Sequence, residues 1–101
     1  MAEAVEFGSF ELQMIQKLTI TVHPFILSEY PDAIYEMINL KQTTTVENYY
    51  EEFEGLLNCL QPNEEIALNI FTHNLKSNIS KAVRFFCLKT LTHALDLAKL
   101  L

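Results

Sequence analysis

Residues 44–60 read TTVENYYEEFEGLLNCL, and they carry the clearest structural pattern of the chain. Their apolar side chains recur three and four residues apart, at Val46, Tyr49, Tyr50, Phe53, Leu56, Leu57 and Leu60. Such a stripe, with glutamates on the opposite side, predicts an amphipathic helix. Thr44 and Glu47 predict a capping box at its start, in which the hydroxyl accepts from the Glu47 amide and the carboxylate reaches back.

Three more helices are expected downstream. Pro62 breaks the chain, and Asn63 is the predicted N-cap of a helix over residues 63–75. A third helix is expected over residues 78–87, and a fourth after the predicted N-cap Thr90. Four short helices with short connections predict a compact all-α bundle of residues 43–101.

The first forty residues are expected to add one or two helices and an extended connector. Residues 31–40 predict a helix that begins at a proline, which suits a first turn. Residues 7–18 predict another. Residues 18–22 alternate like a strand, but no second strand candidate exists to pair with them. We therefore expect a helix that ends in an extended connector, or a strand whose partner is another chain.

Composition bounds the class of protein. The chain has 101 residues, which is enough for one domain, and its two glycines favour helices over many tight turns. Half of the residues are hydrophobic, which excludes general disorder. No run approaches the ~18 apolar residues of a membrane span. The acidic start, with Glu3 and Glu6, does not resemble a signal peptide. We expect an intracellular, cytoplasmic protein without membrane contact.

Charge is distributed unevenly along the chain. Residues 1–75 hold two basic and twelve acidic side chains, whereas residues 76–101 hold five basic side chains and one acidic. The acidic majority argues against nucleic acid as the main ligand, because phosphate neutralisation supplies most of that binding free energy. The basic end is expected to be a solvated face, or to meet the acidic part of a neighbouring copy.

No catalytic or cofactor-binding constellation is evident. Cys59, His73, Cys87 and His93 lack the paired spacing of a structural zinc site. Two isolated glycines cannot form a phosphate-binding loop. We expect no metal, no cofactor and no enzymatic activity, and both cysteines are expected to be free, buried thiols.

Residues 40–53 carry a recognisable motif. Residues 40–42 (LKQ), residues 45–49 (TVENY) and Phe53 resemble the LKQ-x-x-S/T-V-E-x-Y-x-x-x-F signature of Gag proteins from gypsy-class long-terminal-repeat retrotransposons. That signature is the counterpart in these elements of the major homology region of retroviral capsids.

Three further blocks resemble the same family in the same order. Residues 28–32 are similar to its S-x-Y-x-D-P stretch, although here proline precedes aspartate. Residues 71–79 resemble F-x-x-G-L-K-P-E-I, with Asn74 in place of the glycine and Ser77 in place of the proline. Residues 90–98 resemble the T-L-x-x-A-x-x-L-A ending.

The resemblance implies a domain organisation. Residues 43–101 would be a capsid C-terminal domain, and residues 1–42 an arm like the end of a capsid N-terminal domain. The zinc knuckle with which a full Gag binds RNA is missing from this sequence. The signature residues Gln42, Glu47, Tyr49 and Phe53 are expected to support the fold: Gln42 by satisfying backbone groups of its turn, Tyr49 and Phe53 as core aromatics.

The resemblance also implies a twofold dimer through the second helix of this unit. Here that is the helix after Asn63, whose outward face would comprise Glu64, Glu65, Leu68, Phe71 and Thr72. The alternative is that Phe71 belongs to the monomer core. Leu68, Leu97 and Leu100 lie off the main apolar stripes and are expected to be exposed.

Three functions follow as hypotheses. The first is a non-enzymatic assembly domain of a Gag-like capsid, whose partner is a second copy or a related Gag protein. The second is a domesticated Gag-derived module that regulates assembly or binds another protein. The third is an unrelated helical adaptor.

Overall fold

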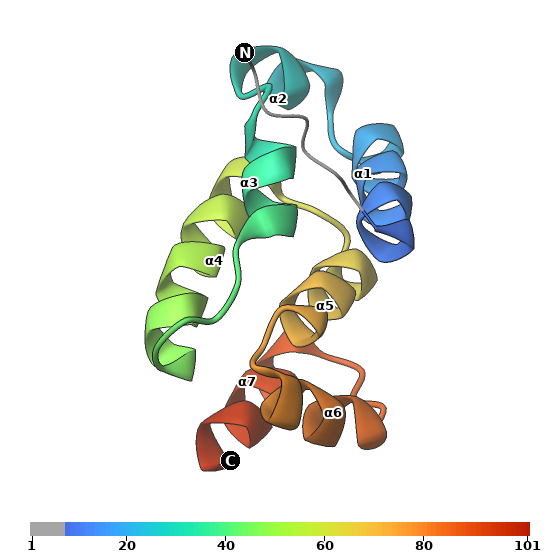
Figure 1. The fold of residues 1–101 in the computed structure, drawn as a ribbon. Coiled ribbons are helices and arrows are strands. Elements are labelled where there is room, and N and C mark those ends of the chain that lie inside the picture. Colours follow the sequence, from blue (N-terminus) through green and yellow to red (C-terminus); the bar gives the residue numbers. More distant parts are fainter. Residues whose placement is uncertain (1–7) are drawn as a thin grey trace, which may run out of the picture.

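The computed structural model describes residues 8–101, which form seven α-helices and no strand. The helices are α1 (Ser9–Thr21), α2 (Pro24–Glu29), α3 (Ala33–Asn39), α4 (Val46–Leu60), α5 (Glu64–His73), α6 (Ser77–Phe85) and α7 (Leu91–Leu100) (Figure 1). The predicted all-α class is confirmed for these residues.

Short polar side chains begin three of the helices. Asn63 and Thr90 are the N-caps of α5 and α7, as predicted, and their side chains accept backbone N–H groups at 2.8 and 3.2 Å. The N-cap of α4 is Thr45 rather than Thr44, and its hydroxyl accepts the Asn48 N–H at 3.1 Å. The predicted capping box with Glu47 is wrong, because this shift places Asn48 three residues after the cap.

Helix α1 continues through the segment predicted as an extended connector. The Thr19 and Thr21 hydroxyls donate to carbonyls four residues earlier, at 2.7 and 2.8 Å, as helical threonines can. Leu18 and Val22, four residues apart, are buried, while Ile20 between them is 75% exposed. The buried residues are spaced four apart, as on one side of a helix, and Ile20 lies on the exposed side. The strand-like alternation of residues 18–22 therefore does not predict the structure here. The predicted start at residue 7 lies outside the described residues.

Helix α2 has no counterpart in the sequence-based prediction, and α3 begins later than predicted. His23 caps α2 by accepting the Phe25 N–H at 3.1 Å on its Nδ1 atom, and Pro24 occupies the first helical turn. None of the residues of α2 is fully buried, but Ile26 and Leu27 are partly buried and pack against the core. Helix α3 begins at Ala33, after a turn that contains Pro31.

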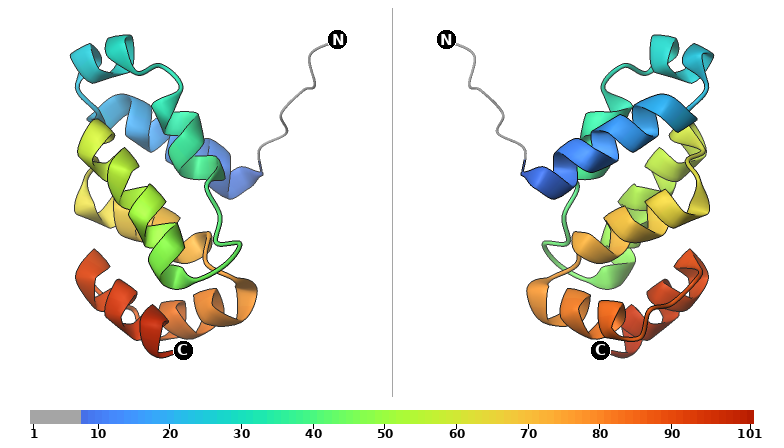
Figure 2. Two further views of the ribbon diagram at one scale, coloured as in Figure 1. Left: turned by 90° about the vertical axis from the view of Figure 1, so that its left-hand side faces the viewer. Right: turned by 90° about the vertical axis from the view of Figure 1, so that its right-hand side faces the viewer.

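The helices stack in tiers around one core. Helices α4 and α5 lie between α1–α3 on one side and α6–α7 on the other (Figure 2). Buried side chains from Met14 in α1 to Ala98 in α7 form a single cluster, with Phe53 and Phe71 among its largest members. This cluster crosses the predicted boundary between residues 42 and 43, and the division into two parts stays a prediction.

The helices of residues 8–101 do not have the length and apolar character required to cross a membrane. Over the same residues, every buried side-chain nitrogen or oxygen has a hydrogen-bond partner. The polar groups of the core are therefore satisfied within the chain.

Candidate functional site

The signature residue Gln42 joins two loops. Its side chain donates from Nε2 to the Thr44 carbonyl at 3.1 Å, and its Oε1 accepts the Lys76 N–H at 2.9 Å. Its own N–H donates to the Asn74 carbonyl at 2.9 Å. The bond to Thr44 confirms the predicted role within its turn. The bonds to residues 74–76 lie beyond that prediction, because they cross more than thirty positions of sequence.

Asn74 completes this loop contact. Its Nδ2 donates to the Ile38 carbonyl at 2.8 Å, and the residue is 4% exposed. Together, Gln42 and Asn74 thereby fix the end of α3 and the connection that follows it to the connection between α5 and α6. In the sequence Asn74 stands out only because it replaces the glycine of the Gag motif, and nothing local indicates its partner.

An aromatic cluster joins α4 to α5. The Tyr49 hydroxyl donates to the Phe71 carbonyl at 3.1 Å, and the two rings stack with centroids 5.0 Å apart. The Phe53 ring centroid lies 5.4 Å from that of Phe71. Burial raises the pKa of the Tyr49 phenol well above its ordinary value, so the hydroxyl remains a donor. The expected core roles of Tyr49 and Phe53 are confirmed.

The outward face implied for α5 is partly wrong, and the alternative for Phe71, a place in the monomer core, is confirmed. Phe71 is fully buried and Thr72 is 7% exposed, with its hydroxyl donating to the Leu68 carbonyl at 2.9 Å. Helices α1, α6 and α7 pack on α5, and the aromatic rings of α4 cover Phe71. Only a narrow strip of α5, which includes Glu64, Glu65 and Leu68, still faces outward.

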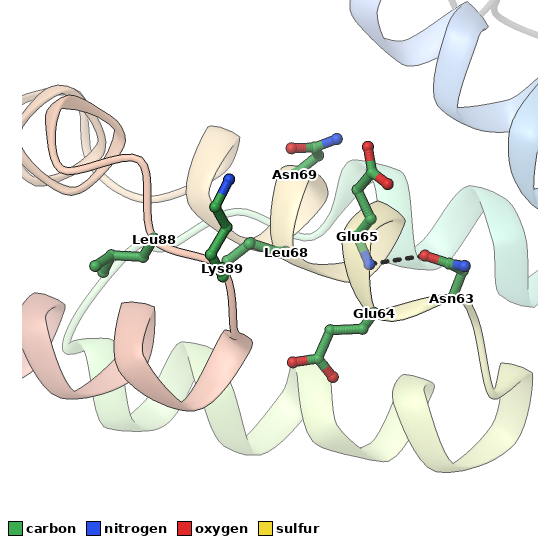
Figure 3. Close-up of a pocket in the computed structure, with 7 residues that line it drawn as sticks. All are labelled: Asn63, Glu64, Glu65, Leu68, Asn69, Leu88 and Lys89. Atoms are coloured by element: carbon green, nitrogen blue, oxygen red, sulfur yellow. Dashed lines mark hydrogen bonds between the residues drawn. The ribbon is translucent and has the colours of Figure 1, made fainter.

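That strip borders a groove, which we call the α5 groove. It has a volume of about 520 Å³ and is lined by Asn63, Glu64, Glu65, Leu68, Asn69, Leu88 and Lys89 (Figure 3). Leu68 extends from α5 toward the loop between α6 and α7, and it packs with Leu88 against the core. Leu68 and Leu88 are thus the two apolar residues of the groove, and its other five lining residues are polar or charged.

Glu64 fixes one wall of the groove. Its Oε1 accepts the Leu91 N–H, the first of α7, at 3.1 Å. A carboxylate at a helix N-terminus satisfies a free donor and complements the helix dipole. Glu64 therefore holds α7 against the start of α5. Both glutamates are exposed, and Glu65 is the second carboxylate of the rim.

An exposed aromatic pair precedes the groove-lining Leu88 by two residues along the chain. Phe85 is 82% exposed and Phe86 58% exposed, with their rings edge-to-face at 5.6 Å. The apolar pattern predicts Phe86 on the buried face of the third helix, but α6 ends at Phe85 and the chain turns.

The two cysteines are less buried than predicted. Cys87, in this turn, is exposed and Cys59 is half-buried, so the prediction of two buried thiols is wrong.

Leu97 and Leu100 also differ in their surroundings. Leu100 is 84% exposed, as expected, whereas Leu97 is partly buried and packs against the core. A second hollow, of about 590 Å³, lies at the start of α4 and is lined by polar residues: Thr43, Thr44, Asn48, Glu51 and Glu52.

The ionisable side chains of residues 8–101 form no group of three or more that could hold a metal ion. His73 stacks on Phe10 with ring centroids 3.7 Å apart. Loss of solvation lowers the pKa of His73, and the nearby Glu11 carboxylate partly opposes this effect. The expected absence of an enzymatic activity and of a cofactor stays a prediction.

No protein-family model, curated protein or solved structure matches this chain.

Proposed function

We propose that this chain is a non-enzymatic self-association domain of the kind that assembles a Gag-like capsid, and that it dimerises through the α5 groove. The observation that carries the proposal is the groove itself, whose lining combines two partly buried leucines, Leu68 and Leu88, with polar and charged residues. It lies on the helix that the resemblance to Gag assigns to a twofold contact.

The packing of α5 supports this choice of surface. Its own chain covers the sides that carry Ile66, Ile70 and Phe71. The strip that remains combines the partly exposed Leu68 with charged and amide groups of the rim. An apolar centre with a polar rim is the usual composition of a protein interface, and a twofold dimer needs only one such self-complementary patch.

The test is light scattering after size-exclusion chromatography over a wide range of protein concentration. We expect the mass to rise toward twice the 11.7 kDa of one chain. Leu68→Asp is expected to return it to that of one chain, because a carboxylate would be desolvated at the centre of the contact. A wild-type chain that stays monomeric at the highest concentration would overturn the proposal.

Two further variants separate the contact from folding. Leu12→Asp introduces the same charge at an exposed leucine of α1, away from the groove, and is expected to leave the dimer intact. Asn69→Arg places a larger side chain in the groove without changing Leu68 or Leu88, and it is expected to weaken the dimer. All variants should retain wild-type helicity by circular dichroism. Dimers that survive both Leu68→Asp and Asn69→Arg would exclude the groove as the interface.

A further inference from the structure

We infer that the α5 groove receives the aromatic pair Phe85 and Phe86 of a second copy, reciprocally, so that one twofold dimer contains two identical insertions. This inference rests on the proposed self-association and names the partner surface. Its occupant is a second copy of this chain, because the pair precedes the groove-lining Leu88 by only two residues and the two surfaces carry complementary features.

The aromatic pair is left in water by its own chain. Phe85 and Phe86 are 82% and 58% exposed, although large apolar side chains gain most from burial. Their edge-to-face contact at 5.6 Å holds the two rings together as one projecting unit. Large aromatic side chains of this kind often contribute much of the binding energy at interfaces.

The pair cannot fill the groove of its own chain in this conformation. Two hydrogen bonds of 3.2 Å, from the Phe86 N–H to the Val83 carbonyl and from the Cys87 N–H to the Arg84 carbonyl, close the turn after α6. Cys87 adopts a left-handed conformation with φ of 50°, which redirects the chain toward Leu88. The turn therefore presents the rings outward while the groove beside it stays open.

The positions of the pair and the groove suit a twofold axis. Leu88 lines the groove and follows Phe86 by two residues, so their Cα atoms are at most about 7.6 Å apart. An axis that passes between two such neighbouring features brings each onto its counterpart in the partner. Both insertions then form within one dimer. No groove or aromatic pair remains unoccupied, so a third copy has nowhere to add.

The charges of the two surfaces are also complementary. The segment around the pair carries Lys81 and Arg84, and residues 76–95 contain no acidic side chain. The groove presents the Glu65 carboxylate and the Lys89 ammonium on its rim, while Glu64 is directed to the start of α7, so Glu65 is the anionic partner that the groove offers. In the dimer Arg84 of one copy approaches Glu65 of the other, which fixes the orientation of the insertion.

The first experiment combines loss and recovery of the dimer. The double variant Phe85→Ser, Phe86→Ser is expected to raise the dimer dissociation constant about thirtyfold or more, as for a buried aromatic hot spot. Both side chains are exposed in the monomer, so helicity should not change. Glu65→Lys and Arg84→Glu should each weaken the dimer, and their combination should restore it.

The second experiment locates the pair directly. Cys87 adjoins Phe86, and Asn69 lines the groove. In the Asn69→Cys variant, oxidised glutathione is expected to produce a disulfide between the introduced thiol of one chain and Cys87 of the other. Peptide mass spectrometry identifies the link. The Asn69→Cys, Cys87→Ser variant removes that product and serves as the matched control.

The outcomes separate this inference from the proposed function. A dimer that is lost in Leu68→Asp, but is unchanged by the double serine variant and forms no 69–87 link, would overturn the insertion and leave self-association in place. A monomeric wild-type chain would overturn both. A dimer that depends on the pair and forms the link between chains supports both.

Discussion

The hydroxyl of Tyr49 donates to the carbonyl of Phe71 at 3.1 Å, and the rings of the same two residues stack with centroids 5.0 Å apart. One residue of α4 thus makes both an apolar and a polar contact with the last turns of α5. The carbonyl lies near the end of α5, where backbone acceptors lose their helical donors. Tyr49 therefore positions the helix whose outer strip borders the α5 groove.

Removal of this hydroxyl is expected to destabilise the fold. Tyr49→Phe keeps the stacked ring but loses the buried donor to Phe71, which should lower the free energy of unfolding by about 1–3 kcal/mol. Urea unfolding followed by circular dichroism measures the change. Tyr50→Phe is the control, because Tyr50 is only half-buried and also meets Phe71, through an edge-to-face ring contact at 5.8 Å. Equal losses in the two variants would contradict the assignment.

Gln42 and Asn74 are expected to act as a coupled pair. Gln42→Ala leaves the Lys76 N–H without its acceptor, and Asn74→Ala leaves the Ile38 carbonyl without its donor. Each variant should cost about 1–3 kcal/mol. Because both side chains hold the same two loops together, a double-mutant cycle should give a coupling of at least about 0.5 kcal/mol. Pairing Gln42→Ala with Asn58→Ala, at an exposed site of α4, should be additive.

Two substitutions in and after α4 are expected to stabilise the chain, one toward glycine and one away from it. Gln61 has φ of 49°, a left-handed conformation that favours glycine, so Gln61→Gly should add about 1 kcal/mol. Gln61→Ala should not. A Cβ atom added at Gly55 would meet nothing within 4 Å beyond its own helix backbone, so Gly55→Ala should add about 0.5–1 kcal/mol. Thermal unfolding checks both, and a loss of stability in Gln61→Gly or Gly55→Ala would refute this account.

His73 is expected to make stability depend on pH. Its pKa is lowered from 6.5 in the folded chain, so the unfolded chain binds more protons between the folded pKa and 6.5. The contribution of neutral His73 is complete above the unfolded pKa and is lost as the pH falls through the folded value. Wild type should therefore lose more stability on acidification than His73→Phe, which keeps the stack on Phe10. Parallel pH curves for the two chains would refute this prediction.

Local signals in the sequence identify most helices but not all of their ends. The side chains of Asn63 and Thr90 cap helices as their identities predict, because an N-cap acts on N–H groups two or three residues away. Residues 43–45 are three consecutive threonines, and any of them could serve as a cap. The structure selects Thr45, since burial of Val46 and the bonds of Gln42 place the chain before α4.

The apolar periodicity predicts which side chains are suited to burial. It does not show which of them the folded chain leaves exposed to solvent. Phe71, for which the sequence left both an outward and a core position open, is fully buried, whereas Phe86, predicted inside, is 58% exposed. The difference depends on where neighbouring helices end and turn. Helix α6 ends at Phe85, one residue before Phe86, and this places the ring beyond the surface that α7 covers.

The all-helical class, the amphipathic face of α4 and the caps of α5 and α7 follow from the order of residues alone, because these features depend on neighbours within about one or two helical turns. Folding in three dimensions was needed to show that Tyr49 meets Phe71, that Gln42 meets Lys76 and that Leu68 and Leu88 line one groove. These contacts join residues 22 and 34 positions apart or lie between separate helices. Their energy is realised only when the helices pack, and no local pattern of residues encodes the partner.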